Sequence, residues 1–148
     1  MSLLDNTAFW SGLTAWALAQ AVKMLLHFRQ KREVDFTLLV STGGMPSAHS
    51  AMVSGLATSV GLSAGWHTPI FAVTLAFAIV VMFDAQSVRR AAGQQARLLN
   101  QIVQELFRTH HLSQTRLAEL LGHTRLEVGM GLLLGVFTAL AMHGWLTP

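Results

Sequence analysis

A glycine-rich stretch followed by a histidine is the first part of the chain whose residue types suit phosphate chemistry. It reads Ser-Thr-Gly-Gly-Met-Pro-Ser-Ala-His-Ser over residues 41–50. Gly43 and Gly44 free the backbone for an anion-cradling loop, and Pro46 suits the first turn of the helix expected next. The helix start would offer N–H groups to a phosphate, with His49 in its first turn as a proton donor. The alternative is an ordinary turn and helix cap that includes a histidine.

A second histidine is followed four residues later by a carboxylate, in the stretch Gly-His-Thr-Arg-Leu-Glu over residues 122–127. This spacing predicts that His123 and Glu127 share one helical face, so that the carboxylate fixes the tautomer of the ring. The other ring nitrogen would then act as nucleophile or base. Gly131 and Gly135 continue that face and favour close helix packing, so the pair is expected to point into the protein. The alternative is an interfacial pair that only anchors the helix.

A third group of polar residues follows the apolar stretch that ends at Phe83. Asp84 is an acidic residue at a membrane boundary, which makes it a functional candidate. Arg89 and Arg90 follow closely, and their guanidinium groups suit bidentate contacts with phosphate oxygens. The alternative is that both arginines determine topology and contact lipid headgroups.

The composition of the chain is typical of a membrane protein. Of its 148 residues, 52% are hydrophobic and 11% are charged, a charged fraction far below that of ordinary soluble domains. The length predicts a single domain over residues 1–148. The absence of cysteine excludes disulfides, thiolate zinc sites and a cysteine nucleophile. The cations flank apolar stretches without interleaved aromatic residues, which favours anionic lipid over nucleic acid as a partner.

Four apolar stretches are candidates for the membrane-spanning helices that would position these residues. They cover about residues 8–26, 46–65, 69–83 and 128–146. All ten Lys and Arg residues lie at the end of the first stretch, in the loop after it, or between the third and fourth stretches. The positive-inside rule therefore places both basic loops in the cytoplasm and both termini outside, in a multi-pass protein of the inner (plasma) membrane.

The segment between the third and fourth stretches has a helical pattern of its own. Its apolar residues recur at helical spacing: Leu98, Leu99, Ile102, Val103, Leu106 and Phe107. This pattern predicts an amphipathic helix along the cytoplasmic membrane surface, and a second short helix is expected from Ser113 to Gly122. The predicted fold class is all-α, a polytopic membrane helical bundle of about four transmembrane helices with one or two amphipathic helices on the cytoplasmic side.

Taken in order, the three polar groups resemble the divergent branch of the type 2 phosphatidic acid phosphatase superfamily, which is described as acid phosphatase and vanadium haloperoxidase related. The matching residues are 43–50, Asp84 with 88–93, and 122–124 with Glu127. The resemblance implies a helical membrane fold and the dephosphorylation of lipid phosphates without a metal, through a phosphohistidine intermediate.

The resemblance also implies roles for single residues. Residues 46–49 resemble the superfamily's Pro-Ser-Gly-His motif, which implies that His49 protonates the leaving group and that Ser47 binds phosphate. His123 with Glu127 resembles its His-x-x-x-Asp pair, which implies a nucleophilic His123 oriented by Glu127. Further residues are expected to contribute to the phosphate site: Lys23, Gly43, Gly44 and Asp84.

The chain departs from the superfamily pattern at several positions. Ala48 replaces Gly, and Glu127 replaces Asp. The arginine that precedes the nucleophile in the superfamily falls on Leu117. The first motif, a Lys followed by Arg-Pro, is incomplete because Lys23 and Arg29 have a different spacing and no Pro follows. The cations expected to replace the missing ones are Arg89 and Arg90.

These motifs predict a lipid-phosphate phosphatase of the cytoplasmic leaflet, a hydrolase of phosphoric monoesters or diphosphates that needs no cofactor. Candidate substrates are phosphatidylglycerophosphate, phosphatidate, and polyprenyl phosphate or diphosphate. Two alternatives keep the fold: a non-catalytic protein that binds or assembles anionic lipids, and a Mg²⁺-dependent phosphatase with Asp84 and Glu127 as ligands. A homodimer that shares helices through the face of Gly131 and Gly135 is a further alternative for the assembly.

Overall fold

The computed structural model describes residues 3–32, 44–106 and 122–146. A short 3-10 helix, η1 (Leu3–Asp5), precedes α1 (Thr7–Lys31), α2 (Ala48–Ala64), α3 (Pro69–Gln86), α4 (Val88–Leu106) and α5 (Arg125–Leu146). The all-α class is therefore confirmed, and each apolar stretch of the sequence corresponds to one helix. Gly43 and nearly all of the short helix expected after Ser113 lie outside the described residues.

Hydroxyl side chains determine where two of the helices begin. Ser47 caps α2, since its hydroxyl accepts a hydrogen bond from the N–H of Ser50 at 3.4 Å. Thr68 caps α3 in the same way, through the N–H of Phe71 at 3.4 Å. The prediction that Pro46 lies in the first turn of α2 is wrong. Pro46 precedes the cap, because the side chain that satisfies the first N–H groups is that of Ser47.

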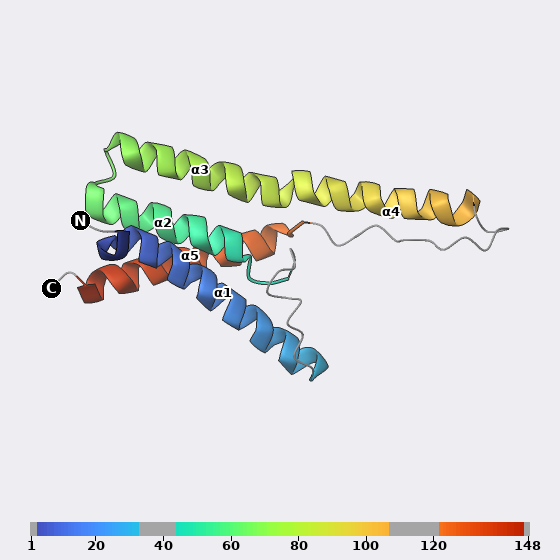
Figure 1. Ribbon diagram of the computed structural model, residues 1–148, viewed down its shortest axis with the longest axis horizontal. Helices are drawn as coiled ribbons and strands as arrows, with labels where there is room; N and C mark the ends of the chain where they lie inside the picture. The colour runs from blue at the N-terminus through green and yellow to red at the C-terminus, as the bar shows by residue number, and fades with distance from the viewer. Residues whose placement is uncertain (1–2, 33–43, 107–121, 147–148) are drawn as a thin grey trace.

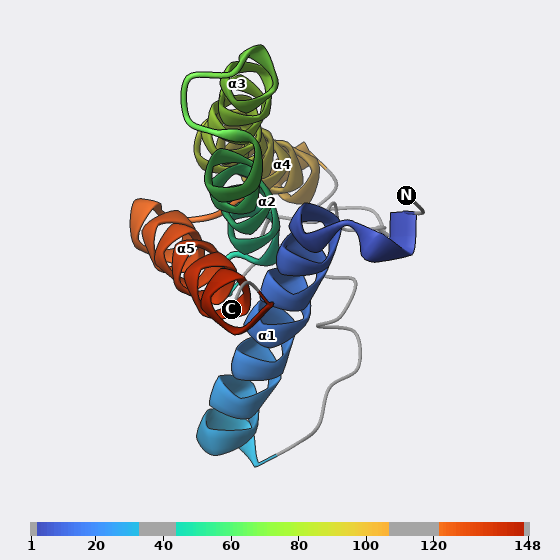
Figure 2. The same ribbon diagram turned by 90° about the vertical axis from the view of Figure 1, so that its left-hand side faces the viewer.

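Helices α1, α2, α3 and α5 run back and forth between the two ends of a bundle (Figure 1). Both termini lie at one end, and α1 carries Arg29 and Lys31 to the other end. Helix α2 lies in the middle, where it contacts α1, α3 and α5 (Figure 2). Its buried residues are mostly Ala, Ser and Gly. Helix α2 therefore faces protein on several sides, which explains why its sequence has weak hydropathy.

The closest helix contact in the bundle depends on two glycines of α5. A Cβ atom added at Gly131 would overlap the carbonyl oxygen of Ser47, and one added at Gly135 would overlap the Ser54 hydroxyl. The Ser54 hydroxyl also donates a hydrogen bond across the contact, to the Leu132 carbonyl at 3.1 Å. The small-residue face predicted for α5 is therefore confirmed as a packing face. It is covered by α2 of the same chain.

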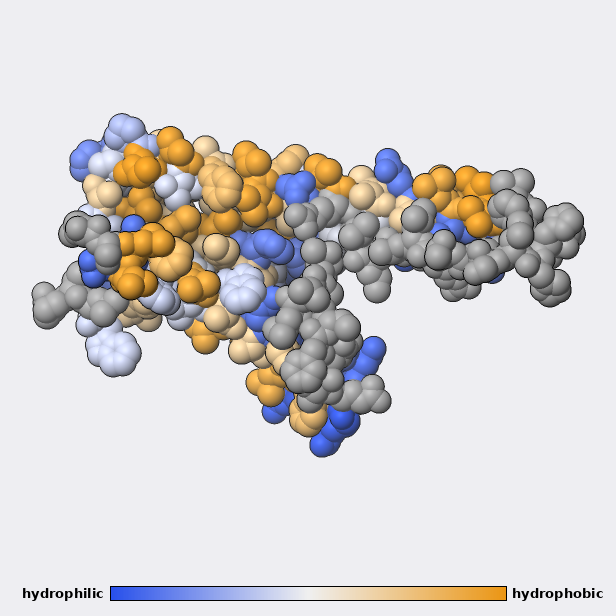
Figure 3. All heavy atoms as spheres, in the orientation of Figure 1, coloured by the Kyte–Doolittle hydropathy of each residue, from blue (hydrophilic) through white to orange (hydrophobic). Residues whose placement is uncertain are grey.

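Helix α3 exposes large apolar side chains on most of its surface, and of its residues Ala78 and Ala85 are buried. Val73, Val80 and Phe83 are 65%, 65% and 68% exposed. Figure 3 shows hydrophobic side chains spread along this helix. An apolar surface of this extent is expected where a helix faces lipid.

Two helical segments of the described residues, Pro69–Gln104 and Arg125–Trp145, are long and apolar enough to cross a membrane. They correspond to the third and fourth expected spans. Helices α1 and α2 do not reach that combination of length and apolarity. Helix α2 has 17 residues, and many of them are small or polar.

Helix α4 differs from the prediction in its direction. It continues almost straight on from α3 and extends beyond the end of the bundle, rather than turning along a membrane surface (Figure 1). Among the described helices it contacts α3 alone. Its amphipathic pattern is present, with Leu98, Leu99 and Ile102 exposed. The hydrogen bond from the N–H of Ser87 to the Phe83 carbonyl at 2.9 Å continues the helical pattern across the junction, which keeps the two helices in line.

Candidate active site

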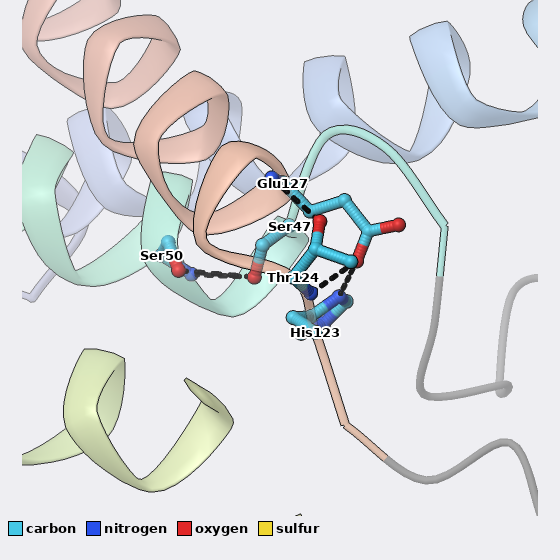
Figure 4. Close-up of polar contacts among 5 residues, drawn as sticks. All are labelled: Ser47, Ser50, His123, Thr124 and Glu127. Carbon is cyan, nitrogen blue, oxygen red and sulfur yellow. Dashed lines mark hydrogen bonds and ion pairs between the residues drawn. The ribbon is translucent and has the colours of Figure 1, made fainter. Parts of the chain in front are cut away.

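Helix α5 begins with a pair of reciprocal hydrogen bonds that the sequence analysis missed. The Thr124 hydroxyl accepts from the N–H of Glu127 at 3.3 Å, and the Glu127 carboxylate accepts from the N–H of Thr124 at 2.9 Å (Figure 4). This is a capping box, which satisfies two of the free N–H groups at a helix start. Its signature, Thr-x-x-Glu before an apolar run, was present in the sequence.

The carboxylate of the capping box also contacts the histidine that precedes the helix. Nδ1 of His123 lies 3.2 Å from Oε2 of Glu127. The His123 side chain is 3% exposed, and that of Glu127 is 20% exposed. When Nδ1 carries the proton it donates to the carboxylate, and Nε2 then carries the lone pair of the ring. The predicted pairing of His123 with Glu127 is therefore present, and it suits a nucleophilic Nε2.

Two backbone hydrogen bonds bring the three polar groups of the sequence to one place. The N–H of Ser47 donates to the Glu127 carbonyl at 3.0 Å, which joins the start of α2 to the start of α5. The N–H of His123 donates to the Ala85 carbonyl at 2.9 Å, which joins His123 to the end of α3. Residues distant in sequence thus meet at the end of the bundle opposite the termini (Figure 1).

Lys23 of α1 approaches this place from another side. Its side chain is 5% exposed, and its ammonium group interacts electrostatically with Glu127. Its aliphatic part lies beside Gly44, because a Cβ added at Gly44 would be 3.6 Å from Cγ and Cδ of Lys23. Gly44 has a φ of +84°, which favours glycine at that position. The structure therefore places Lys23 and Gly44 with the histidine pair.

His49 lies on α2 in the turn that follows the Ser47 cap, and its side chain is exposed. It precedes Val53 by one helical turn, and Val53 packs against Ala78 of α3. His49 is thus on the side of α2 that faces α3, near the end of α3 that contacts His123. Ser47 is fully buried, and its hydroxyl accepts hydrogen bonds within α2 from the Ser50 N–H and hydroxyl, the latter at 3.0 Å.

The third predicted group lies around the junction of α3 and α4. Asp84 is half-buried and directly precedes Ala85, whose carbonyl contacts His123. Arg89 and Arg90 belong to the first turn of α4, and their side chains lie outside what the structure describes.

The two carboxylates of the alternative Mg²⁺ site are Asp84 and Glu127. Among the residues described, no group of three His, Asp or Glu side chains could hold a metal ion. Oε2 of Glu127 contacts Thr124 and His123, and the positive charge of Lys23 acts on the same carboxylate. A magnesium site at Asp84 and Glu127 therefore stays a prediction.

Comparison with known proteins assigns the chain to a family. The family described as "Divergent PAP2 family" matches residues 4–138, a range that contains every candidate residue named above. A relative from Bacillus subtilis (strain 168), the uncharacterized membrane protein YuiD, is 40% identical over 153 residues, which cover 96% of this chain and 97% of the relative. No solved structure matches the chain. The chain is therefore a membrane protein of the divergent PAP2 family.

Proposed function

We propose that this protein is a lipid-phosphate phosphatase that works through a phosphohistidine on His123. The observation that carries the proposal is the contact of the buried His123 side chain, through Nδ1, with the Glu127 carboxylate at 3.2 Å. A carboxylate at Nδ1 stabilises the ring tautomer whose lone pair is on Nε2, and it stabilises the positive charge that forms when Nε2 bonds to phosphorus.

The reaction consists of two displacements at phosphorus. In the first, Nε2 of His123 attacks the phosphate, the bond from phosphorus to the lipid oxygen breaks, and His49 donates a proton to that oxygen. In the second, His49 takes a proton from a water molecule as it attacks phosphohistidine, the P–N bond breaks, and inorganic phosphate leaves. Lys23 and the glycine backbone at Gly44 stabilise the negative charge of the transferring phosphoryl group.

The charge distribution supports the cytoplasmic leaflet as the place of the reaction. The histidine pair lies at the end of the bundle where α1 carries Arg29 and Lys31, opposite both termini. The positive-inside rule assigns such an end to the cytoplasm of the inner (plasma) membrane. Lipid phosphates made on the inner side would therefore be the substrates: phosphatidylglycerophosphate, phosphatidate, or a polyprenyl phosphate or diphosphate.

Phosphate release by the purified protein from these lipids tests the proposal, with His123→Ala and His49→Ala as paired variants. We expect wild type to release phosphate, and each variant to lose about three orders of magnitude or more in kcat. Chelator should leave the wild-type rate unchanged, whereas loss of activity would favour the Mg²⁺-dependent alternative. Release that does not exceed the His123→Ala level for any lipid would contradict the proposal and favour headgroup binding without catalysis.

A further inference from the structure

One oxygen atom of Glu127 serves both the start of α5 and the candidate nucleophile. Oε2 accepts the N–H of Thr124 at 2.9 Å and lies 3.2 Å from Nδ1 of His123. The Thr124 hydroxyl holds the backbone of the same glutamate, at 3.3 Å from its N–H. Figure 4 shows the three side chains grouped at the first turn of α5. The position of the carboxylate is therefore determined by Thr124, although Thr124 itself does not contact the imidazole through its hydroxyl.

We infer that Thr124 is a positioning residue, which holds Glu127 so that His123 carries its ring proton on Nδ1. This inference rests on the proposed function, because it concerns the histidine proposed as nucleophile. In a neutral imidazole, the nitrogen that lies against a fixed hydrogen-bond acceptor is the one that carries the proton. A carboxylate held at Nδ1 selects the Nδ1–H form, and the reactive lone pair is then on Nε2.

Backbone hydrogen bonds to other helices also hold His123 and Glu127 in place. The His123 backbone is held by the Ala85 carbonyl of α3, and the Glu127 backbone carbonyl is held by the Ser47 N–H of α2. The charged group that acts on Glu127 from α1 is the Lys23 ammonium. These contacts fix where the two backbones lie, whereas the Thr124 contacts fix the first turn from which the carboxylate extends. Loss of the Thr124 hydroxyl should therefore loosen the carboxylate more than the bundle.

The test compares Thr124→Val, which keeps the shape and removes the hydroxyl, with Thr124→Ser, which keeps the hydroxyl. The matched control is Thr68→Val, because Thr68 caps α3 through its hydroxyl at the opposite end of the bundle. The full-length protein in detergent is labelled with ¹⁵N-histidine, and the His123 signals are assigned by their absence in His123→Gln. The ratio of Nδ1–H to Nε2–H forms is measured at alkaline pH without substrate.

We expect wild type, Thr124→Ser and Thr68→Val to keep the Nδ1–H form of His123. Thr124→Val should lower the ratio of Nδ1–H to Nε2–H by about fivefold to tenfold, the effect of loosening one hydrogen bond. Its kcat for phosphate release should fall about 10- to 100-fold with little change in KM, as is typical when a partner that orients an imidazole is lost.

An unchanged tautomer ratio in Thr124→Val would overturn the inference, and so would an equal shift in Thr68→Val, which would indicate general loosening of the fold. The tautomer measurement needs no substrate and no turnover. A wild-type protein without phosphatase activity would therefore contradict the proposed function, while the tautomer ratios would still decide the role of Thr124.

Discussion

Lys23 is a buried cation of α1 whose charge interacts with Glu127, the carboxylate of the histidine pair. A buried ammonium that interacts electrostatically with a carboxylate, with its aliphatic part against Gly44, suits the binding of an anion such as a phosphate. This position is the reason that we propose Lys23 as a group that binds substrate as well as a counter-charge for the carboxylate.

Replacement of this lysine should therefore weaken substrate binding more than an equal loss of charge elsewhere on α1. We expect Lys23→Met to raise KM for lipid phosphate by about 10- to 100-fold, the effect of losing one hydrogen bond to a charged group. The matched control is Lys31→Met, which removes an exposed cation from the same helix. Steady-state kinetics on both variants check this, and equal effects would indicate that only net surface charge matters.

The sequence alone was sufficient to pair His123 with Glu127, because a spacing of four residues is a local property. The capping box of Thr124 and Glu127 could also be predicted, because its signature, Thr-x-x-Glu before an apolar run, is local in sequence. The contacts of His123 with Ala85 and of Ser47 with Glu127 could not be predicted. They join backbone groups far apart in sequence, and a backbone hydrogen bond leaves no trace in residue type.

At the scale of elements, the contact of α5 with α2 depends on the absence of a side chain at Gly135. A Cβ there would overlap two groups of α2, the side-chain hydroxyl of Ser54 and the backbone carbonyl of Ala51. Neither group can move far, because α2 is packed between α1, α3 and α5. A single added methyl group should therefore separate the two helices.

We expect Gly135→Ala to lower the free energy of unfolding by about 1–3 kcal/mol, the usual effect of overpacking a tight contact. Gly129→Ala on the same helix is the matched control, since a Cβ there meets no atom within 4 Å. The control should be neutral or more stable by about 0.5–1 kcal/mol, because alanine favours helix. Thermal or denaturant unfolding in detergent measures both. A stable Gly135→Ala protein would mean that the helices are less tightly packed than described.

The elements also show why some predictions failed. Apolar periodicity located each helix, because burial and helical spacing are recorded in sequence. It could not give the direction of α4, since an amphipathic helix has the same pattern whether it lies on a membrane or continues α3. Hydropathy underestimated α2 for a related reason. Its serines and glycines allow close contact with α1 and α5. A segment of that composition resembles a polar loop when only hydropathy is considered.

At the scale of the whole molecule, the ends of the bundle differ in charge, and this difference predicts orientation. The chain has no cysteine, so single cysteines can report it. The sites are Asp5 and Trp145 at the end that holds the termini, and Lys31 and Gln101 on the other side.

We expect membrane-impermeant maleimide to label Asp5→Cys and Trp145→Cys in intact cells. It should label Lys31→Cys and Gln101→Cys only after the membrane is opened, because the positive-inside rule predicts that the basic end faces the cytoplasm. Labelling of Gln101→Cys in intact cells would reverse the leaflet assignment.

The hydrogen bond from His123 to Ala85 also has a consequence for the architecture of the chain. It joins the residue at which the polypeptide leaves the bundle to the residue at which it returns, with an N···O distance of 2.9 Å. The segment between Ala85 and His123 includes α4, and its two ends therefore lie at one point. Segments whose two ends meet in this way can be lengthened, shortened or exchanged with little effect on the structure that carries them. The four packed helices and the segment between Ala85 and His123 can therefore diverge independently. His123, the candidate nucleophile, lies where this segment rejoins the bundle.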